Sequence, residues 1–205
     1  MQSIRKIIGM ECANPLNEPP DNRFQKNSPA MTIPIARTDS LVLRPLQPTD
    51  AEVLLHIYQT EGVLQYFPTT TPPPLERVER FIAGQQEHWE KHGYGNWGIM
   101  PEGESQIAGW AGLQFLPELN DTEVGYLLAK PFWGRGYATK TARASIQFGF
   151  ERCGLDYIIA LVHPENLASR RVIEKCGMTY VETINLWGID LMRHRIDLND
   201  WRKSP

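Results

Sequence analysis

The stretch at residues 122–150, TEVGYLLAKPFWGRGYATKTARASIQFGF, indicates a strand, a glycine-containing loop and a helix, in that order. Residues 124–128 form a short apolar run that ends before a Lys-Pro pair, which is typical of a buried strand. Residues 133–138, WGRGYA, hold two glycines and an arginine, and apolar residues then recur at helical spacing as far as Phe150. Such a loop presents backbone N–H groups and a helix N-terminus to an anion. We therefore expect it to bind a phosphate-bearing ligand.

The spacing within this loop narrows the choice of ligand. A Walker loop would end in Gly-Lys-Ser/Thr, and the dinucleotide fingerprint would need a third glycine where Thr139 stands. The sequence WGRGYA instead resembles the acetyl-CoA pyrophosphate loop Q/R-x-x-G-x-G/A of the GNAT acetyltransferases. Trp133 takes the first position, Gly136 is the central glycine and Ala138 is the last small residue. A tryptophan at the first position is similar to the RimJ/RimL branch, whose founding members acetylate the N-termini of ribosomal proteins.

A second motif follows at the distance that this family would require. Residues 163–178, HPENLASRRVIEKCGM, resemble the family segment N-x-x-S-x-x-x-x-E-K-x-G-F, with Met178 in place of the usual aromatic residue. The matching positions are Asn166, Ser169, Glu174, Lys175 and Gly177. Together with the flanking elements, the resemblance covers about residues 40–200, and the chain is identified as similar to the RimJ/RimL type of GNAT acetyltransferase.

The resemblance implies an α/β (mixed α+β) fold with a central, mostly antiparallel sheet that is flanked by helices and splayed between its fourth and fifth strands. The hydrophobic pattern predicts the order β-α-α-β-β-β-α-β-α-β-β, with a first strand at residues 41–44. Residues 1–30 are rich in Pro and Asn and are expected to form an extended or mobile extension. Residues 31–205 are expected to form a single acetyltransferase domain.

The resemblance also implies how acetyl-CoA is held. The pantetheine arm would lie between the strands carrying Glu123 and Tyr157 and would pair with the main chain near Leu127 and Leu128. Asn166 would hold the pantetheine amide; its alternative role is a helix N-cap, and both roles can coexist. The pyrophosphate would meet the N–H groups of Arg135, Gly136, Tyr137 and Ala138.

Acetyl transfer to an amine requires a neutral amine, a polarised thioester carbonyl and a proton for the leaving thiolate. The candidate general base is Glu123, acting through water, and the alternative is a solvated carboxylate at a strand edge. The candidate proton donor or thiol-binding group is Ser169, with the phenols of Tyr126 and Tyr180 as further donors; its alternative role is a local bond at a helix start. Cys176 is expected to be a small buried thiol and not a nucleophile.

Three further expectations concern individual side chains and segments. Lys140 stands where the family commonly has Glu, and we expect it to face a CoA phosphate. His88 and His92 lie one turn apart, but without a third ligand a solvated helix end is favoured over a metal site. Residues 62–74, residues 116–121 and the hairpin around residues 185–190 are expected to select the acceptor.

Composition restricts the function class. The chain has 205 residues, a net charge of −3 and no basic stripe, so one cytosolic globular domain without a nucleic-acid partner is expected. No apolar run approaches a membrane span, and three cysteines without CxxC spacing argue against a zinc site, so no metal and no membrane partner are expected.

The expected function is an acetyl-CoA-dependent N-acetyltransferase acting on a small-molecule amine or a peptide N-terminus. The alternatives are a non-catalytic acyl-CoA-binding module and a nucleotide-binding protein. Exposed edge strands also leave a homodimer open.

Overall fold

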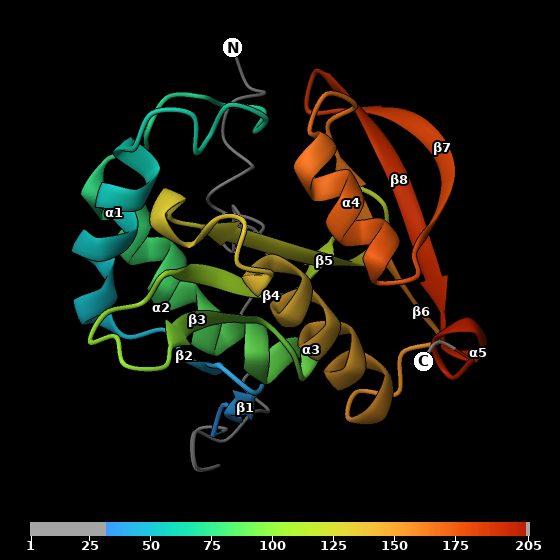
Figure 1. Ribbon diagram of the computed structural model, residues 1–205, viewed down its shortest axis with the longest axis horizontal. Helices are drawn as coiled ribbons and strands as arrows, with labels where there is room; N and C mark the ends of the chain where they lie inside the picture. The colour runs from blue at the N-terminus through green and yellow to red at the C-terminus, as the bar shows by residue number, and fades with distance from the viewer. Residues whose placement is uncertain (1–31, 204–205) are drawn as a thin grey trace, which may run out of the picture.

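The protein is described by a computed structural model that covers residues 32–203. The extension predicted for residues 1–30 lies outside the described residues. Figure 1 shows the elements around one central sheet. The sheet has eight strands in the order β1-β2-β3-β4-β5-β6-β8-β7. The strands are β1 (Ala36–Arg37), β2 (Leu41–Pro45), β3 (Asn96–Pro101), β4 (Gly109–Leu116), β5 (Asp121–Leu128), β6 (Tyr157–Val162), β7 (Thr179–Leu186) and β8 (Ile189–Asp197).

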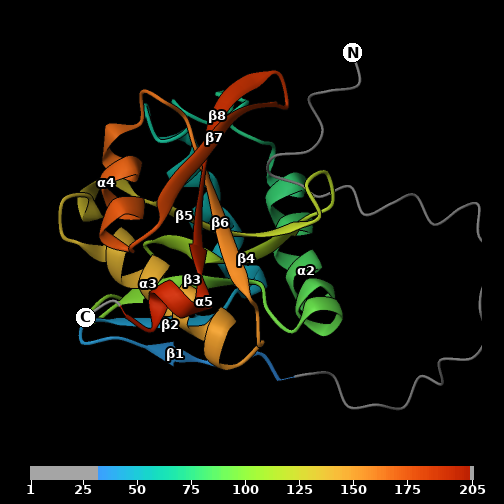
Figure 2. The ribbon, with the colours of Figure 1, turned by 90° about the vertical axis from the view of Figure 1, so that its right-hand side faces the viewer.

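Helices flank this sheet. They are α1 (Ala51–Gln59), α2 (Leu75–His92), α3 (Tyr137–Glu151), α4 (Leu167–Lys175) and the short α5 (Leu198–Trp201), with 3₁₀ turns at Pro48–Asp50 and Lys130–Phe132. In Figure 2, α3 and α4 lie on one side of the strands and α2 lies on the other. The expected mixed α/β fold with a mostly antiparallel sheet is therefore confirmed. The predicted element order omits β1 and α5, because segments of two and four residues show no periodic pattern.

Helix α3 shows why the sequence forms a helix at this place. Its buried residues Ala142, Ile146 and Phe150 recur every four positions, so they form one apolar stripe that packs in the main core. Burying a large apolar side chain contributes about 1.5–3 kcal/mol each. This packing fixes the start of α3, and with it the loop that precedes the helix.

The sheet opens between β5 and β6. Strands β4 and β5 are paired antiparallel along their whole length, from Gly109–Leu128 to Leu116–Asp121. Strands β5 and β6 are parallel and pair at a single register position, Glu123 with Ile159. These are the fourth and fifth strands of the sequence-based pattern, which lacked β1, so the expected splay is confirmed.

The hairpin of β7 and β8 turns two residues later than the sequence suggests. The turn consists of Trp187 and Gly188, whose φ angles are 57° and 82°, between the paired residues Leu186 and Ile189. Asn185, the expected turn residue, lies in β7, and its amide donates to Asp190 Oδ1 at 2.8 Å. The prediction of a turn near Asn185 is therefore corrected, and the change brings a tryptophan to the tip.

The histidine pair on α2 also differs from its expected environment. His88 is buried and not solvated. The N–H of Phe115 donates to its Nε2 at 3.2 Å, so Nδ1 carries the proton and donates to the carbonyl of Tyr94 at 2.8 Å. Burial lowers the pKa of His88, in agreement with this neutral ring. Within residues 32–203, no cluster of three or more His, Cys, Asp or Glu side chains is placed to hold a metal ion.

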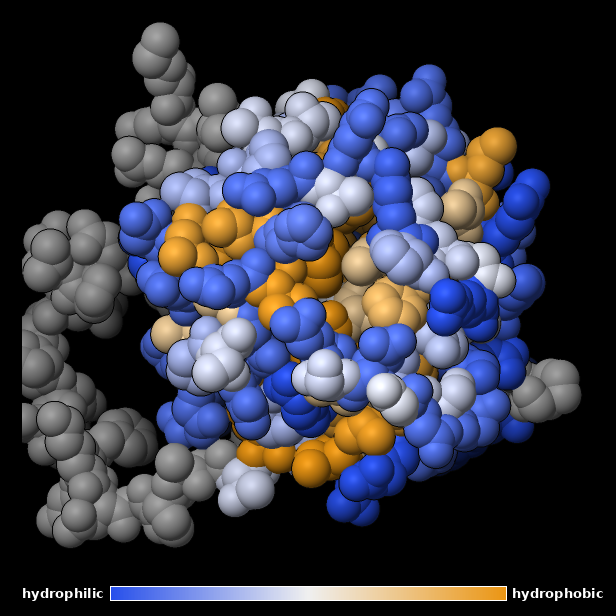
Figure 3. Space-filling view, turned by 60° about the vertical axis from the view of Figure 1, so that its left-hand side comes forward, coloured by the Kyte–Doolittle hydropathy of each residue, from blue (hydrophilic) through white to orange (hydrophobic). Residues whose placement is uncertain are grey.

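The outer surface carries a mixture of polar and apolar side chains. Figure 3 shows a mainly hydrophilic face with apolar residues gathered near its middle. No helix within the described range combines the length and the apolar character of a membrane span.

Candidate active site

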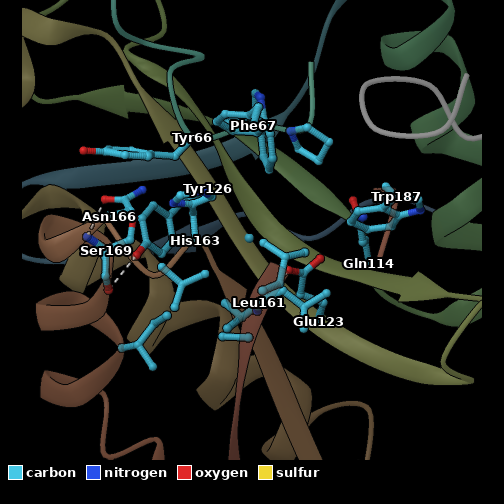
Figure 4. Close-up of a pocket in the computed structure, with 18 residues that line it drawn as sticks. Tyr66, Phe67, Gln114, Glu123, Tyr126, Leu161, His163, Asn166, Ser169 and Trp187 are labelled. Carbon is cyan, nitrogen blue, oxygen red and sulfur yellow. Dashed lines mark hydrogen bonds between the residues drawn. The ribbon is translucent and has the colours of Figure 1, made fainter. Parts of the chain in front are cut away.

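A cavity of about 150 Å³ lies in the gap between β5 and β6 (Figure 4). Its walls come from segments that are distant in sequence: the segment before α2, strands β4, β5 and β6, the start of α4, and the tip of the β7–β8 hairpin. The lining residues are Tyr66, Phe67, Pro68, Trp110, Gln114, Glu123, Val124, Gly125, Tyr126, Ala160, Leu161, Val162, His163, Asn166, Ser169, Ile173, Trp187 and Leu191. The structure thus brings together three of the predicted site residues: Glu123, Asn166 and Ser169.

Glu123 lies at the floor of this cavity. One of its carboxylate oxygens accepts a hydrogen bond from the backbone N–H of Leu161 at 3.2 Å. Burial raises the pKa of Glu123 to about 8, and the bond from Leu161 opposes this rise. Glu123 is half-buried and bonded to β6, so it is not a freely solvated strand-edge carboxylate. A carboxylate that titrates near neutral pH is suited to general-base chemistry.

The start of α4 forms a second wall of the cavity. The Oδ1 atom of Asn166 accepts a hydrogen bond from the N–H of Ser169 at 3.0 Å, so Asn166 caps the helix. Neither the amide N–H groups of Asn166 nor the hydroxyl of Ser169 bonds to any residue in the range 32–203. The phenol of Tyr126 donates to the backbone carbonyl of Ser169 at 3.4 Å. Tyr180, the other phenol considered, is exposed on β7 and bonds to Thr183.

The main chain of β5 offers free groups to the same gap. The carbonyl oxygen of Leu127 faces β4, since a Cβ added to Gly109 would overlap it. Successive residues of a strand direct their hydrogen-bonding groups to opposite edges, so those of Tyr126 and Leu128 face away from β4. The carbonyl of Leu128 already accepts a hydrogen bond from the indole N–H of Trp133 at 2.7 Å. The main-chain groups closest to the expected pairing are therefore those of Tyr126 and Leu128, and not those of Leu127.

The glycine loop lies beyond the end of β5, outside the cavity. Gly134 and Gly136 have φ angles of 73° and 78°, and a Cβ at either would meet no atom within 4 Å. Helix α3 begins at Tyr137 without a side-chain cap. Because the first N–H groups of a helix have no intrahelical partner, those of the first turn remain available to a ligand. Arg135 lies over the ring of Phe132, at 5.4 Å from its centroid. The free N–H groups at the start of α3 and the charge of Arg135 in the same loop suit the binding of an anion.

Comparison with known proteins assigns the family. The model of the family described as an acetyltransferase (GNAT) domain matches residues 40–179. The chain belongs to the GNAT acetyltransferase family. A relative, the uncharacterized N-acetyltransferase YoaA of Bacillus subtilis (strain 168), is 30% identical over 149 residues, which cover 70% of this chain and 82% of that protein. The resemblance found in the sequence is therefore confirmed, and so is the assignment of the protein as an acyltransferase.

Solved GNAT structures agree with this fold. A crystal structure of the acetyltransferase from Agrobacterium tumefaciens strain C58 has a TM-score of 0.70 and 25% identity, and the match covers 84% of this chain and 99% of that chain. The ribosomal L7/L12 α-N-protein acetyltransferase RimL, solved with coenzyme A, has a TM-score of 0.69 and 17% identity, with 82% and 99% coverage. The second match shows the fold alone. Acetyl-CoA is the acetyl donor of the GNAT family.

Lys140 of this GNAT domain has protein partners that the sequence did not indicate, whereas Cys176 matches its expectation. Lys140 lies 2.8 Å from Asp39 Oδ1 and donates to Ser40 Oγ at 2.8 Å, so it contacts the turn between β1 and β2. Lys140 also lowers the pKa of Asp39. The carboxylate of Asp39 therefore offsets the unfavourable interaction between the charge of Lys140 and the helix dipole, a role expected of a CoA phosphate from the sequence. Cys176 is buried, and burial raises its pKa to about 11, as expected for a structural thiol.

Proposed function

We propose that the protein transfers an acetyl group from acetyl-CoA directly to a primary amine within a ternary complex. The observation that carries this proposal is the cavity between β5 and β6, where Glu123 has a pKa of about 8 and shares the walls with Ser169 and Asn166. Acetyl-CoA supplies the activated acetyl thioester. The acceptor is a small-molecule amine or a peptide N-terminus, and the ribosomal-protein substrate of RimL is one example of the second kind.

The residues from the end of β5 to the start of α3 suit acetyl-CoA. We assign the pyrophosphate to the N–H groups of Arg135, Gly136, Tyr137 and Ala138, because α3 starts uncapped and its N-terminus favours anions. The pantetheine arm pairs with main-chain groups of Tyr126 and Leu128 that face the gap, in place of the pair Leu127 and Leu128. The amide of Asn166 donates to the arm while its Oδ1 caps α4.

We assign the two proton transfers of the reaction to Glu123 and Ser169. Glu123 takes a proton from the incoming ammonium through water, which leaves the amine nucleophilic. The C–N bond forms as the C–S bond breaks. The second proton that the nitrogen loses passes to the leaving sulfur through the hydroxyl of Ser169, which orients and shares it. Tyr126 holds the backbone of Ser169 in place through its hydrogen bond to the carbonyl.

Thermal stability tests the ligand assignment, because a ligand that binds only the native state raises the melting temperature. Acetyl-CoA and free CoA should raise it, and ATP at the same concentration should not. Addition of primary amines should then release CoA. A shift without release on any amine would favour the non-catalytic acyl-CoA-binding module, and no shift would remove the loop assignment. A cytosolic location and a homodimer remain predictions.

A further inference from the structure

We infer that the acceptor is a primary amine on an unbranched methylene, joined to an aromatic or apolar body and without a neighbouring carboxylate, and that Trp187 selects it. The inference rests on the acetyl transfer proposed above. It separates the amine classes that the sequence leaves open: peptide N-termini, polyamines, amino sugars and free amino acids.

The cavity has two unlike ends, as Figure 4 shows. Asn166 and Ser169 lie at one end, where the thioester is assigned. Trp187 and Gln114 lie at the other end, and Glu123 lies beside Gln114, its cross-strand neighbour. An amine that reaches Glu123 from the second end therefore leaves its remaining atoms against Trp187 and Gln114.

Charge decides which acceptors fit this end. Among the lining residues there is no Lys or Arg, and Glu123 is the only carboxylic acid. The Nδ1 atom of His163 accepts a hydrogen bond from the N–H of Glu165 at 3.2 Å, so this ring nitrogen offers no N–H to an acceptor carboxylate. A carboxylate on the acceptor would thus be buried unpaired beside Glu123. The extra ammonium groups of a polyamine or an amino sugar would find no further carboxylate among the lining residues.

Size and shape restrict the acceptor further. The cavity of about 150 Å³ has room for little more than a single benzene ring, but it is partly open to the surface, so the body of the acceptor can extend out of it. The same space also has to hold the acetyl group, so the carbon that bears the amine can carry only one further substituent. A methylene meets this condition, whereas an α-carbon with two substituents does not. Around it, Phe67, Trp110 and Trp187 supply aromatic walls, and Tyr66 stacks on His163 with 5.4 Å between ring centroids.

The backbone of Trp187 gives an independent indication of a role. A two-residue hairpin turn with positive φ at both positions favours Asn, Asp or Gly at the first, and a bulky residue there is an outlier. Trp187 occupies this position with a φ of 57° and still lines the cavity. Its indole N–H donates to Glu118 Oε1 at 3.5 Å, in the connection between β4 and β5. Backbone strain of this kind clusters at functional sites.

A comparison of acceptors tests the substrate class. CoA release from acetyl-CoA by the full-length protein would be measured with 2-phenylethylamine, phenylalanine, phenylalaninamide and spermidine. We expect kcat/KM for 2-phenylethylamine to exceed each of the others at least about tenfold, equivalent to 1.4 kcal/mol. Equal or better use of any of the other three overturns the inference and leaves acetyl transfer intact. No release with any amine, while acetyl-CoA still raises the melting temperature, overturns the proposed catalysis and this inference together.

Variants of the hairpin test Trp187 itself. Trp187→Asn places a favoured residue at positive φ, so the melting temperature should be unchanged or higher. We expect the KM for 2-phenylethylamine to rise at least about fivefold, while the Kd for acetyl-CoA stays within about twofold. Val181→Ala, an exposed apolar site on the same hairpin, is the matched control and should change neither. An unchanged KM in Trp187→Asn would overturn the role of Trp187.

Discussion

The carboxylate of Glu123 accepts a hydrogen bond from the backbone N–H of Leu161 at 3.2 Å, across the gap where β5 and β6 separate. The bond favours the charged carboxylate and burial favours the neutral acid. Burial is the larger effect, since the pKa of Glu123 is raised to about 8. The carboxylic acid of the cavity lining therefore changes its charge near neutral pH, and this property can be tested in several ways.

Glu123→Gln should alter how stability depends on pH. The folded pKa of about 8 lies above the ordinary value of 4.5, so the folded protein binds a proton that the unfolded chain has lost between these values. The contribution of Glu123 to the free energy of unfolding is therefore fully present below pH 4.5 and is lost as the pH rises through 8. Glutamine does not titrate, so the melting temperature of the variant relative to wild type should rise from about pH 5 to about pH 9. A constant difference would contradict the raised pKa.

Ser169→Ala should lower turnover without weakening acetyl-CoA binding. The variant keeps the backbone N–H that bonds to Asn166, so the cap of α4 is retained. Loss of a positioned proton donor typically costs on the order of 10²-fold in rate. The measurement is kcat for CoA release at saturating acetyl-CoA. Leu167→Ala, an exposed change in the same helical turn, serves as the control, and equal kcat values in the two variants would remove Ser169 from the mechanism.

Two substitutions at Asn166 separate its capping role from ligand binding. Asn166→Ala removes the cap and should cost about 1 kcal/mol of stability. Asn166→Asp keeps an oxygen that can accept from the N–H of Ser169 but has no amide N–H to donate. We expect both variants to bind CoA more weakly and only the alanine variant to melt earlier. Wild-type CoA affinity in Asn166→Asp would leave capping as the sole role of the side chain.

The glycine loop can be tested with a matched pair. Gly136 and Gly103 have φ angles of 78° and 82°, and a Cβ at either position would meet no atom within 4 Å. Alanine at each should cost a similar amount of stability, about 1–2 kcal/mol, because both residues adopt the left-handed conformation. Only Gly136→Ala should weaken acetyl-CoA binding, by about tenfold or more. Titration calorimetry would show this, and equal affinities would contradict the assignment of the loop.

Local signals in the sequence predicted the part of the fold that holds the cofactor loop. The apolar run of β5, the glycines that follow it and the four-residue spacing in α3 are all short-range patterns, and each corresponds to an element of the structure. The splay beside β5 could be expected only from the family resemblance, since no residue pattern encodes it. The turn at Trp187 was missed because Asn185 is the better turn former in isolation.

Long-range contacts explain why other parts of the site were not predicted. Lys140 and Asp39 are 101 residues apart in sequence, so their ion pair leaves no trace in any local pattern. The same holds for the stacking of Tyr66 on His163, which joins the segment before α2 to the end of β6. Asn166 and Ser169 could be predicted because a motif marks them, and Glu123 because the family resemblance pointed to its strand, whereas the aromatic walls depend on how distant loops pack.

The most direct test of the account is the rate of CoA release from acetyl-CoA with a primary amine, measured against pH for wild type and Glu123→Gln. Deprotonation of the free amine affects both proteins alike, so the difference between them reports Glu123. We predict that wild-type kcat/KM rises with an inflection near pH 8, and that the variant is on the order of 10²-fold slower and lacks this inflection. Equal rates and equal pH profiles would contradict a catalytic role for Glu123.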